Sequence, residues 1–228
     1  EEAFASQLQH QKMLAVKNFA YGAGHEINNP LANISSRAQR LVSEEKDPER
    51  RRILATIETQ AHRASAMIAD LMLFAVPPDI KLVPNNVQEM ISKVVEEMAE
   101  YTDPKGLIVE VASQGDVLIQ ADRSACMEMF KAVIQNSIDA MEVGKIKISW
   151  EVNNDALVVV IEDDGPGIPE DQVPIVFDPF FSGREAGRGI GFGLTKAWRI
   201  MQLHYGDIQV ENREPGVATR MQFVTSPV

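Results

Sequence analysis

The sequence has little cysteine, a deficit of positive charge and no long apolar run. A single cysteine, Cys126, excludes an internal disulfide and suits a reducing compartment. Lys and Arg number 22 against 33 Asp and Glu, for a formal net charge of -11, which argues against nucleic acid or an anionic membrane as the main partner. No apolar stretch approaches the roughly 20 residues that span a bilayer, and no signal peptide is present. We therefore expect a cytoplasmic location, with any membrane anchor in segments absent from this chain.

The composition supports folded cores, because 45% of the 228 residues are hydrophobic. This length fits one large domain or two of ordinary size. Cys126 lies in a predicted helix beside Met127 and Met129, which favours a buried structural thiol over a reactive one. No other histidine or cysteine stands at metal-ligand spacing from His10, His62 or His204, so no zinc site is expected.

The first third of the chain predicts an antiparallel helical hairpin. Residues 4–43 are rich in helix formers, and the charged segment Glu44–Pro48 separates them from a second helical run. Both runs show apolar or small residues at alternating spacings of four and three, which is a heptad seam. Two helices bury little, so a homodimeric four-helix bundle is the simplest solution, with packing against the chain's own C-terminal part as the alternative. The seam positions are Ala20, Gly24, Ile27, Leu31, Ile34, Ala38 and Leu41, then Ile53, Ile57, Gln60, Ala64, Met67, Leu71 and Phe74.

Two prolines, Pro77 and Pro78, end the second helix and mark a domain boundary. Beyond them, Asn85 or Asn86 is placed to cap a helix, and further helices are predicted at 123–141 and 194–205. Helices mixed with short β-rich runs predict an α+β protein whose second domain is a two-layer α/β sandwich. The β-rich runs are 107–111, 117–120, 146–152, 157–161, 208–210 and 219–224.

A histidine in the first helix is the leading chemical candidate. His25 is one residue past Gly24, so its ring is expected on the exposed flank of the bundle, with Asn29 one turn later. Pro30 cannot donate a backbone hydrogen bond, so we expect the helix to bend beside the histidine. A neutral imidazole is a good nucleophile near pH 7, and the adjacent carboxylate of Glu26 can accept its proton.

Four later segments suggest a nucleotide site. Asn136 to Ala140 brings a carboxamide suited to Mg²⁺ to a helix end, although this segment taken alone is better explained as a plain polar helix face. Asp163 to Pro169 follows a strand, where an aspartate can accept from an adenine amino group, although many ordinary turns look alike. Phenylalanines at 177, 180 and 181 need a surface to cover, either a lid or a satellite core. Gly187 to Leu194 frees backbone amides at a helix start for phosphates.

In this order and spacing, the five segments resemble the H, N, G1, F and G2 boxes of sensor histidine kinases, and His204–Ile208 resembles the family's His-Gly-Gly. The resemblance covers essentially the whole chain and implies three parts: a dimerisation and histidine phosphotransfer hairpin at 1–76, a proline-containing linker at 77–84 and a GHKL-type ATP-binding domain at 85–228. The linker and short lid are similar to the nitrogen-regulation type of kinase.

The resemblance also implies roles. His25 would be the phosphoacceptor, Glu26 its acid–base neighbour, and Asn29 would orient water when a partner is dephosphorylated. Mg²⁺ would be held by Asn136, and adenine read by Asp163. The phosphoryl group would pass from ATP to His25 and then to the receiver domain of a response regulator. The residues implied to contact ATP are Asn136, Asp139, Asp163, Gly165, Gly167, Arg184, Arg188, Gly189, Gly191, Gly193 and Leu194.

The sequence departs from the family pattern at three positions. Ala132 replaces an asparagine one turn before the metal ligand, Asp164 replaces a frequent asparagine, and Tyr205 replaces a glycine. Two alternatives follow. One is a GHKL ATPase or protein kinase acting on another chain, with His25 only structural. The other is a degenerate scaffold that docks regulators without kinase activity.

Overall fold

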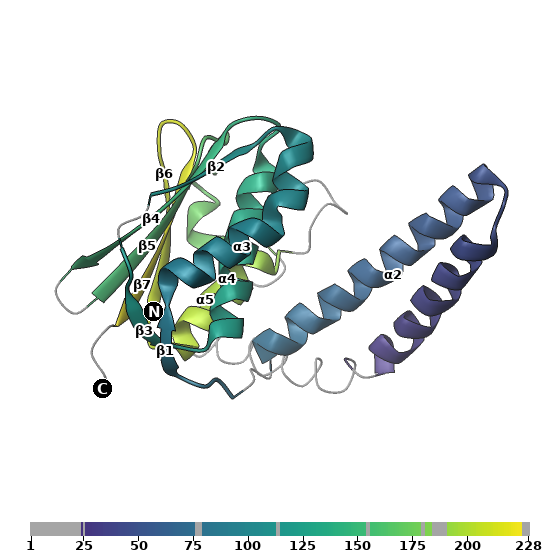
Figure 1. Cartoon of the computed structure of the whole chain (residues 1–228), viewed down its shortest axis with the longest axis horizontal. Coiled ribbons are helices and arrows are strands. Elements are labelled where there is room, and N and C mark those ends of the chain that lie inside the picture. The colour runs from purple at the N-terminus through teal and green to yellow at the C-terminus, as the bar shows by residue number, and fades with distance from the viewer. Residues whose placement is uncertain are drawn as a thin grey trace. The chain divides into compact units, whose positions relative to one another are not determined.

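The computed structural model describes residues 24, 26–75, 79–112, 115–153, 156–178, 181–183 and 191–224. They fall into two compact units, Glu1–Pro78 and Asp79–Val228 (Figure 1). Each unit has its own packing and is described by itself.

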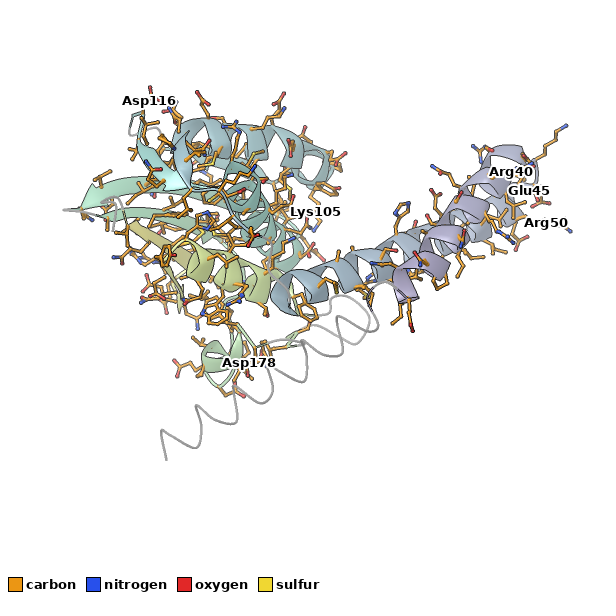
Figure 2. All side chains as sticks on the ribbon, turned by 90° about the horizontal axis from the view of Figure 1, so that it is seen from below. Arg40, Glu45, Arg50, Lys105, Asp116 and Asp178 are labelled. Atoms are coloured by element: carbon orange, nitrogen blue, oxygen red, sulfur yellow. The ribbon has the colours of Figure 1, made fainter. Side chains whose placement is uncertain are left out.

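The first unit is a helical hairpin, as predicted. Its first helix is described over 26–44, and α2 follows at Pro48–Ala75 after a connection of three residues, 45–47. Asp47 starts α2, because its Oδ1 accepts from the backbone N–H groups of Glu49 at 2.9 Å and Arg50 at 3.0 Å. Pro48 then occupies the first helical position, where its missing N–H costs nothing. The charged tip of the hairpin carries Arg40, Glu45 and Arg50 (Figure 2).

The covered face of the hairpin coincides only in part with the predicted apolar seam: Gly24, Leu31 and Ala38 are covered, but other seam positions are exposed. Ser35, Ala38 and Ala61 are buried, whereas Ile34 is 46% and Ile53 56% exposed. On the first helix the covered positions repeat at spacings of four and three, and the exposed Ile27, Ile34 and Leu41 lie beside them. Contacts within one chain therefore cover only part of the predicted apolar seam. The covered or half-covered positions are Gly24, Asn28, Leu31, Ser35, Ala38 and Val42 on the first helix, and Leu54, Ala55, Glu58, Ala61, Arg63, Ala64, Ser65, Met67, Ile68 and Met72 among the described side chains of α2.

The second unit is the predicted two-layer α/β sandwich. A five-stranded sheet has the order β2-β4-β5-β7-β6, in which β2 pairs parallel with β4 and the other pairs are antiparallel. The helices α3, α4 and α5 lie together on one face of this sheet (Figure 1). The elements are β1 (Val83–Asn86), α3 (Val87–Thr102), β2 (Ile108–Val111), β3 (Leu118–Ala121), α4 (Arg123–Ala140), β4 (Lys145–Asn153), β5 (Ala156–Asp163), α5 (Gly193–Leu203), β6 (Asp207–Asn212) and β7 (Val217–Val224), with 3-10 turns at Asp103–Lys105 and Val173–Ile175.

The alternation of burial along the strands separates an inner from an outer face of the sheet. In β4, Ile146, Ile148 and Trp150 are buried against the helices, while the residues between them face outward. Trp150, Phe130 and Phe223 are the largest fully buried side chains. Removing this apolar surface from water is the main force that holds the helical layer to the sheet.

Side-chain caps set the starts of α3 and α4. Asn86, one of the two predicted caps, accepts from Glu89 N–H at 3.3 Å, and Asp122 accepts from Ala125 N–H at 3.0 Å. The sequence did not predict β1, because Pro84, Asn85 and Asn86 carry no β-rich signal. This strand forms by antiparallel pairing with β3.

Candidate functional site

The carboxylate of Asp163 lies at the centre of the candidate site. It stands at the end of β5 on the helix-facing side and is 9% exposed. Ser137 Oγ donates to its Oδ2 at 2.8 Å, and Gly165 N–H donates to its Oδ1 at 3.0 Å. Each carboxylate oxygen thus keeps a free lone pair while its direction is fixed from two sides. An aspartate held in this way can accept a hydrogen bond from a ligand amino group.

The end of α4 supplies the polar residues beside this carboxylate. Asn136 is half-buried, and Asp139 is exposed and accepts from Gln135 Nε2 at 2.7 Å. Lys105 caps this end of the helix, because its Nζ donates to the carbonyl of Ile138 at 2.7 Å (Figure 2). This bond satisfies a carbonyl group at the C-terminal end of α4 that has no partner within the helix.

The start of α5 lies against the same stretch of α4. A Cβ placed on Gly193 would be 3.8 Å from both Asn136 Oδ1 and the carbonyl oxygen of Ala132. The carboxamide oxygen of Asn136 therefore faces the N-terminal end of α5, where free backbone N–H groups and the helix dipole favour anions. Leu194 follows in the first turn of α5 and is half-buried. A hard oxygen ligand beside an anion-binding helix end fits an Mg²⁺ ion bound with phosphates.

The approach to α5 is packed too tightly for side chains. Gly191 has a φ of +71°, and a Cβ on it would collide with the backbone of Phe181. Thr195 is fully buried, and its Oγ1 donates to the carbonyl of Gly191 at 3.1 Å and to that of Asp178 at 3.2 Å (Figure 2). These contacts draw the phenylalanine-bearing segment and the glycine segment together, as a lid would require.

The loop after β5 is held by a residue that the sequence did not single out. Asn212 of β6 accepts from Ile168 N–H at 2.8 Å and donates through Nδ2 to the Ile168 carbonyl at 2.7 Å. It also crowds Gly167, which has a φ of +81°. Gly216 contributes in the same way, because a Cβ there would collide with the carbonyl of Asp163. These partners lie more than 40 residues away in the chain, so no local pattern could reveal them.

The contacts of Asp164 show why an aspartate can replace the asparagine that is frequent at this position in the family. Its Oδ2 accepts from Lys145 N–H at 3.1 Å, and its backbone N–H donates to the Lys145 carbonyl at 3.2 Å. Either a carboxylate or a carboxamide oxygen can make the first bond. The residue thus ties the site loop to the start of β4.

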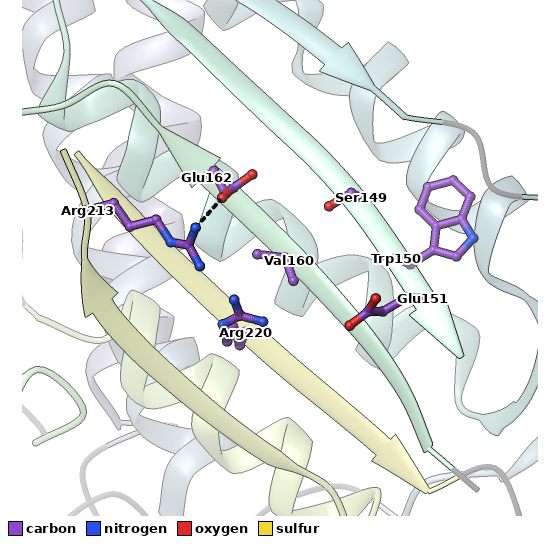
Figure 3. Close-up of a pocket in the computed structure, with 7 residues that line it drawn as sticks. All are labelled: Ser149, Trp150, Glu151, Val160, Glu162, Arg213 and Arg220. Carbon is purple, nitrogen blue, oxygen red and sulfur yellow. Dashed lines mark ion pairs between the residues drawn. The ribbon is translucent and has the colours of Figure 1, made fainter. Parts of the chain in front are cut away.

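A separate hollow of about 180 Å³ lies on the sheet and is lined by residues of β4, β5 and β7 together with Arg213; Asp163 is not among them (Figure 3). Charged side chains line it, and Arg213 and Glu162 form an ion pair at 3.3 Å. Arg213 and Arg220 also share the Oε1 atom of Glu211, at 2.8 and 3.0 Å. These bonds lower the pKa of Glu211, with the hydrogen bond from Arg213 as the first cause. None of the predicted site residues lines this hollow.

The remaining predicted site residues are not drawn together by the described structure. Glu26 and Asn29 are exposed on the first helix of the hairpin. His25, Arg184, Arg188 and Gly189 lie outside the described residues.

Comparisons with known proteins show which family has this combination of a helical hairpin and an α/β sandwich. Residues 121–228 match the model of the histidine kinase-, DNA gyrase B-, and HSP90-like ATPase, and residues 15–76 match the His Kinase A (phospho-acceptor) domain. The second unit is thus an ATP-binding domain of this ATPase class. The catalytic domain of the histidine kinase ThkA is 30% identical, with a TM-score of 0.60 over 64% of this chain and 97% of that one. The chain belongs to the histidine kinase family.

Longer relatives extend the match over both units. Sporulation kinase C of Bacillus subtilis is 26% identical over 219 residues, covering 95% of this chain and 50% of the relative. The sensory histidine kinase/phosphatase NtrB of Vibrio alginolyticus is 29% identical over 220 residues, covering 90% and 61%. Full-length ShkA in complex with AMPPNP shares the fold, with a TM-score of 0.78, 20% identity and coverage of 92% and 47%. The chain spans about half the length of sporulation kinase C.

Proposed function

We propose that this chain is the catalytic core of a sensor histidine kinase that phosphorylates His25 with ATP and transfers the phosphoryl group to an aspartate of a response regulator. The observation that carries the proposal is the order of parts: a phospho-acceptor hairpin match at 15–76 followed by an ATPase match at 121–228. Phosphatase activity toward the same regulator is included, because NtrB, a relative, is named as both kinase and phosphatase.

The chemical step is an in-line displacement at phosphorus. A ring nitrogen of His25 attacks the γ-phosphorus, the bond to the β–γ bridging oxygen breaks, and ADP leaves. The imidazole proton passes to Glu26, the adjacent carboxylate. Asn29, one turn from His25, would direct water at the phosphorylated aspartate of the regulator in the phosphatase reaction, which releases inorganic phosphate.

The nucleotide is bound by the second unit. Asp163 accepts from the adenine amino group, while Gly165 and Gly167 let the backbone approach the base. Gly191, Gly193 and Leu194 present the start of α5 to the phosphates, and Asn136 would hold Mg²⁺, which would neutralise phosphate charge. The other proposed contacts are Asp139, which follows Asn136 in the same segment, Arg188 and Gly189 in the glycine-rich segment, and Arg184 just before that segment.

A second copy of the chain completes the hairpin. Ile27, Ile34 and Leu41 on the first helix and Ile53 and Ile57 on α2 are between 37% and 56% exposed. Such a regular exposed apolar stripe marks an interaction surface, and a four-helix bundle covers it symmetrically. Dimerisation through this stripe supports the reading of the N-terminal unit as a dimerisation and phosphotransfer hairpin.

The partner we propose for phosphotransfer is a receiver domain. A solved structure of the histidine kinase ThkA in complex with the response regulator protein TrrA matches 99% of this chain with a TM-score of 0.69 and 23% identity. The regulator would dock on the hairpin near His25. We place the reaction in the cytoplasm; in the described parts of the chain, no helix combines the length and apolarity needed to cross a membrane.

The test is labelling with γ-³²P-ATP and Mg²⁺, using the wild-type chain and His25→Gln. The proposal expects label on the wild type alone, lost in acid and retained in alkali, and transferable to a receiver domain. Label that survives in His25→Gln points to a kinase acting elsewhere. Intact ATP binding without any label supports a regulator-docking scaffold instead.

A further inference from the structure

His204 is a buried titratable residue that the proposed reaction does not use. It follows the last residue of α5, is 5% exposed and packs edge-on against Phe223 with ring centroids 6.3 Å apart. The Asp122 N–H donates to its Nε2 at 3.0 Å, so Nε2 carries no proton. Its Nδ1–H therefore donates to the Ile200 carbonyl at 2.7 Å. Both ring nitrogens are committed, one to α5 and one to the segment that starts α4.

Asp122 joins three parts of the domain at this point. Its Oδ1 accepts from Ser124 Oγ at 2.6 Å and Ala125 N–H at 3.0 Å, which caps α4. Its Oδ2 accepts from the backbone N–H of Lys81 at 3.0 Å, which holds the segment leading into the domain. These bonds, with that from Lys81 first, lower the pKa of Asp122 to about 2. The carboxylate is thus a fixed anion at neutral pH.

The other end of the same helix pair is the candidate nucleotide site. Gly193, the first residue of α5, lies against Ala132 and Asn136 of α4, whereas His204, just beyond the last residue, lies against Asp122. Between these ends, Lys196 Nζ and Glu128 Oε2 are 3.2 Å apart. The two helices therefore run antiparallel and are joined at both ends. Over 11 residues α5 spans about 16 Å.

We propose that Asp122 and His204 are positioning residues, a clamp that aligns the start of α5 with Asn136 for ATP binding. Helices transmit displacement as stiff rods, and a binding site needs its groups placed within about 0.5 Å. A shift of α5 along α4 at the His204 end therefore moves the Gly193 end as well. The inference rests on the ATP site of the proposed function and adds two residues that would touch neither nucleotide nor metal.

Two substitutions of His204, each of which keeps one of its two hydrogen bonds, distinguish a clamp between α4 and α5 from a simple cap on α5. In His204→Gln the carbonyl oxygen can take the place of Nε2 and keep the bond from Asp122 N–H. In His204→Asn the carboxamide N–H can take the place of Nδ1–H and keep only the bond to Ile200. The clamp predicts that His204→Gln binds ATP within about two-fold of wild type, while His204→Asn binds roughly three- to ten-fold more weakly, by calorimetry at a temperature where both remain folded.

The opposite order of affinities, equal weakening in both variants, or unchanged affinity with only a lower melting temperature each overturns the proposal. If the variants do not fold, the proposal can still be tested on the wild type alone. Because coupling is reciprocal, saturating ATP should slow hydrogen exchange at the Asp122 amide. Unchanged exchange at that amide contradicts the clamp. A wild type that binds no ATP would instead refute the proposed function.

Discussion

Asp163→Asn tests the proposed adenine contact most sharply. In the wild type, Oδ1 accepts from Gly165 N–H and Oδ2 from Ser137 Oγ. In the variant, a carboxamide oxygen in the place of Oδ1 keeps the Gly165 bond, and the Ser137 hydroxyl can rotate to accept from the new Nδ2–H. The local fold should therefore survive, but the variant has lost the negative charge of the carboxylate and one of its two acceptor oxygens, so its hydrogen bond to an adenine amino group should be weakened or lost.

The magnitude follows from the charge of the acceptor. A hydrogen bond to an ionised group is worth about 1.5 to 3 kcal/mol, which corresponds to a roughly 10- to 100-fold higher Kd for ATP. Calorimetry with a non-hydrolysable ATP analogue measures this change directly. Wild type should also discriminate against GTP, which lacks the amino group at that ring position, and the variant should lose this discrimination.

Glu162→Gln is the matched control, because Glu162 is the preceding residue of β5 and lies on the outer face in an ion pair with Arg213. Its ATP affinity should stay within about two-fold of wild type, because Glu162 is on the sheet face opposite Asp163 and its ion pair with the exposed Arg213 contributes little. An Asp163→Asn variant that is folded and binds ATP like wild type, or a Glu162→Gln variant that loses as much, would refute the assignment of Asp163.

Three further predictions concern stability and assembly. Tyr205 has a φ of +56° and is 73% exposed, so Tyr205→Gly should raise the free energy of unfolding by about 1 kcal/mol in urea titrations, and a decrease would show that its ring has stabilising contacts. Burial lowers the pKa of His204, so the native state binds fewer protons than the unfolded chain below about pH 6.5, the ordinary pKa of histidine. The free energy of unfolding should therefore be highest above about pH 6.5 and fall as the pH decreases below it. The urea midpoints at pH 7.5 and pH 5.5 should differ less in His204→Gln than in wild type. Ile34→Asp should convert a dimer to a monomer in analytical ultracentrifugation and leave the ATP affinity unchanged. The control Arg37→Asp, at an exposed position of the same helix, should remain a dimer. If both variants remain dimers, this stripe is not the interface.

The sequence predicted the layers well because their signals are local. The cap at Asn86, the break at Asp47 and Pro48, and the alternation along β4 all depend on neighbours within a few residues. The prediction that Cys126 is a buried thiol is confirmed, and burial raises its pKa to about 12. The predicted strands are found within one or two residues of the observed bounds.

What the sequence could not predict depends on distant partners. The heptad pattern predicts an apolar stripe but not which part of it the second helix covers, so the exposure of Ile27, Ile34 and Leu41 beside the covered Gly24, Leu31 and Ala38 appears only in three dimensions. Asn212 holds the loop after β5 and Lys105 the end of α4 through bonds to residues 44 and 33 positions away, and Asp122 bonds to His204, 82 positions away. Their sequence neighbourhoods look like ordinary strand, turn and cap residues.

The most direct test of the central claim is to locate the phosphoryl group after incubation with ATP and Mg²⁺. Trypsin should release residues 18–37 between Lys17 and Arg37, a peptide whose single histidine is His25 and which also contains Tyr21, Ser35 and Ser36. Tandem mass spectrometry at neutral pH should place the added phosphoryl group on His25. A phosphoryl group on one of the hydroxyl residues, or on a different peptide, would contradict the account.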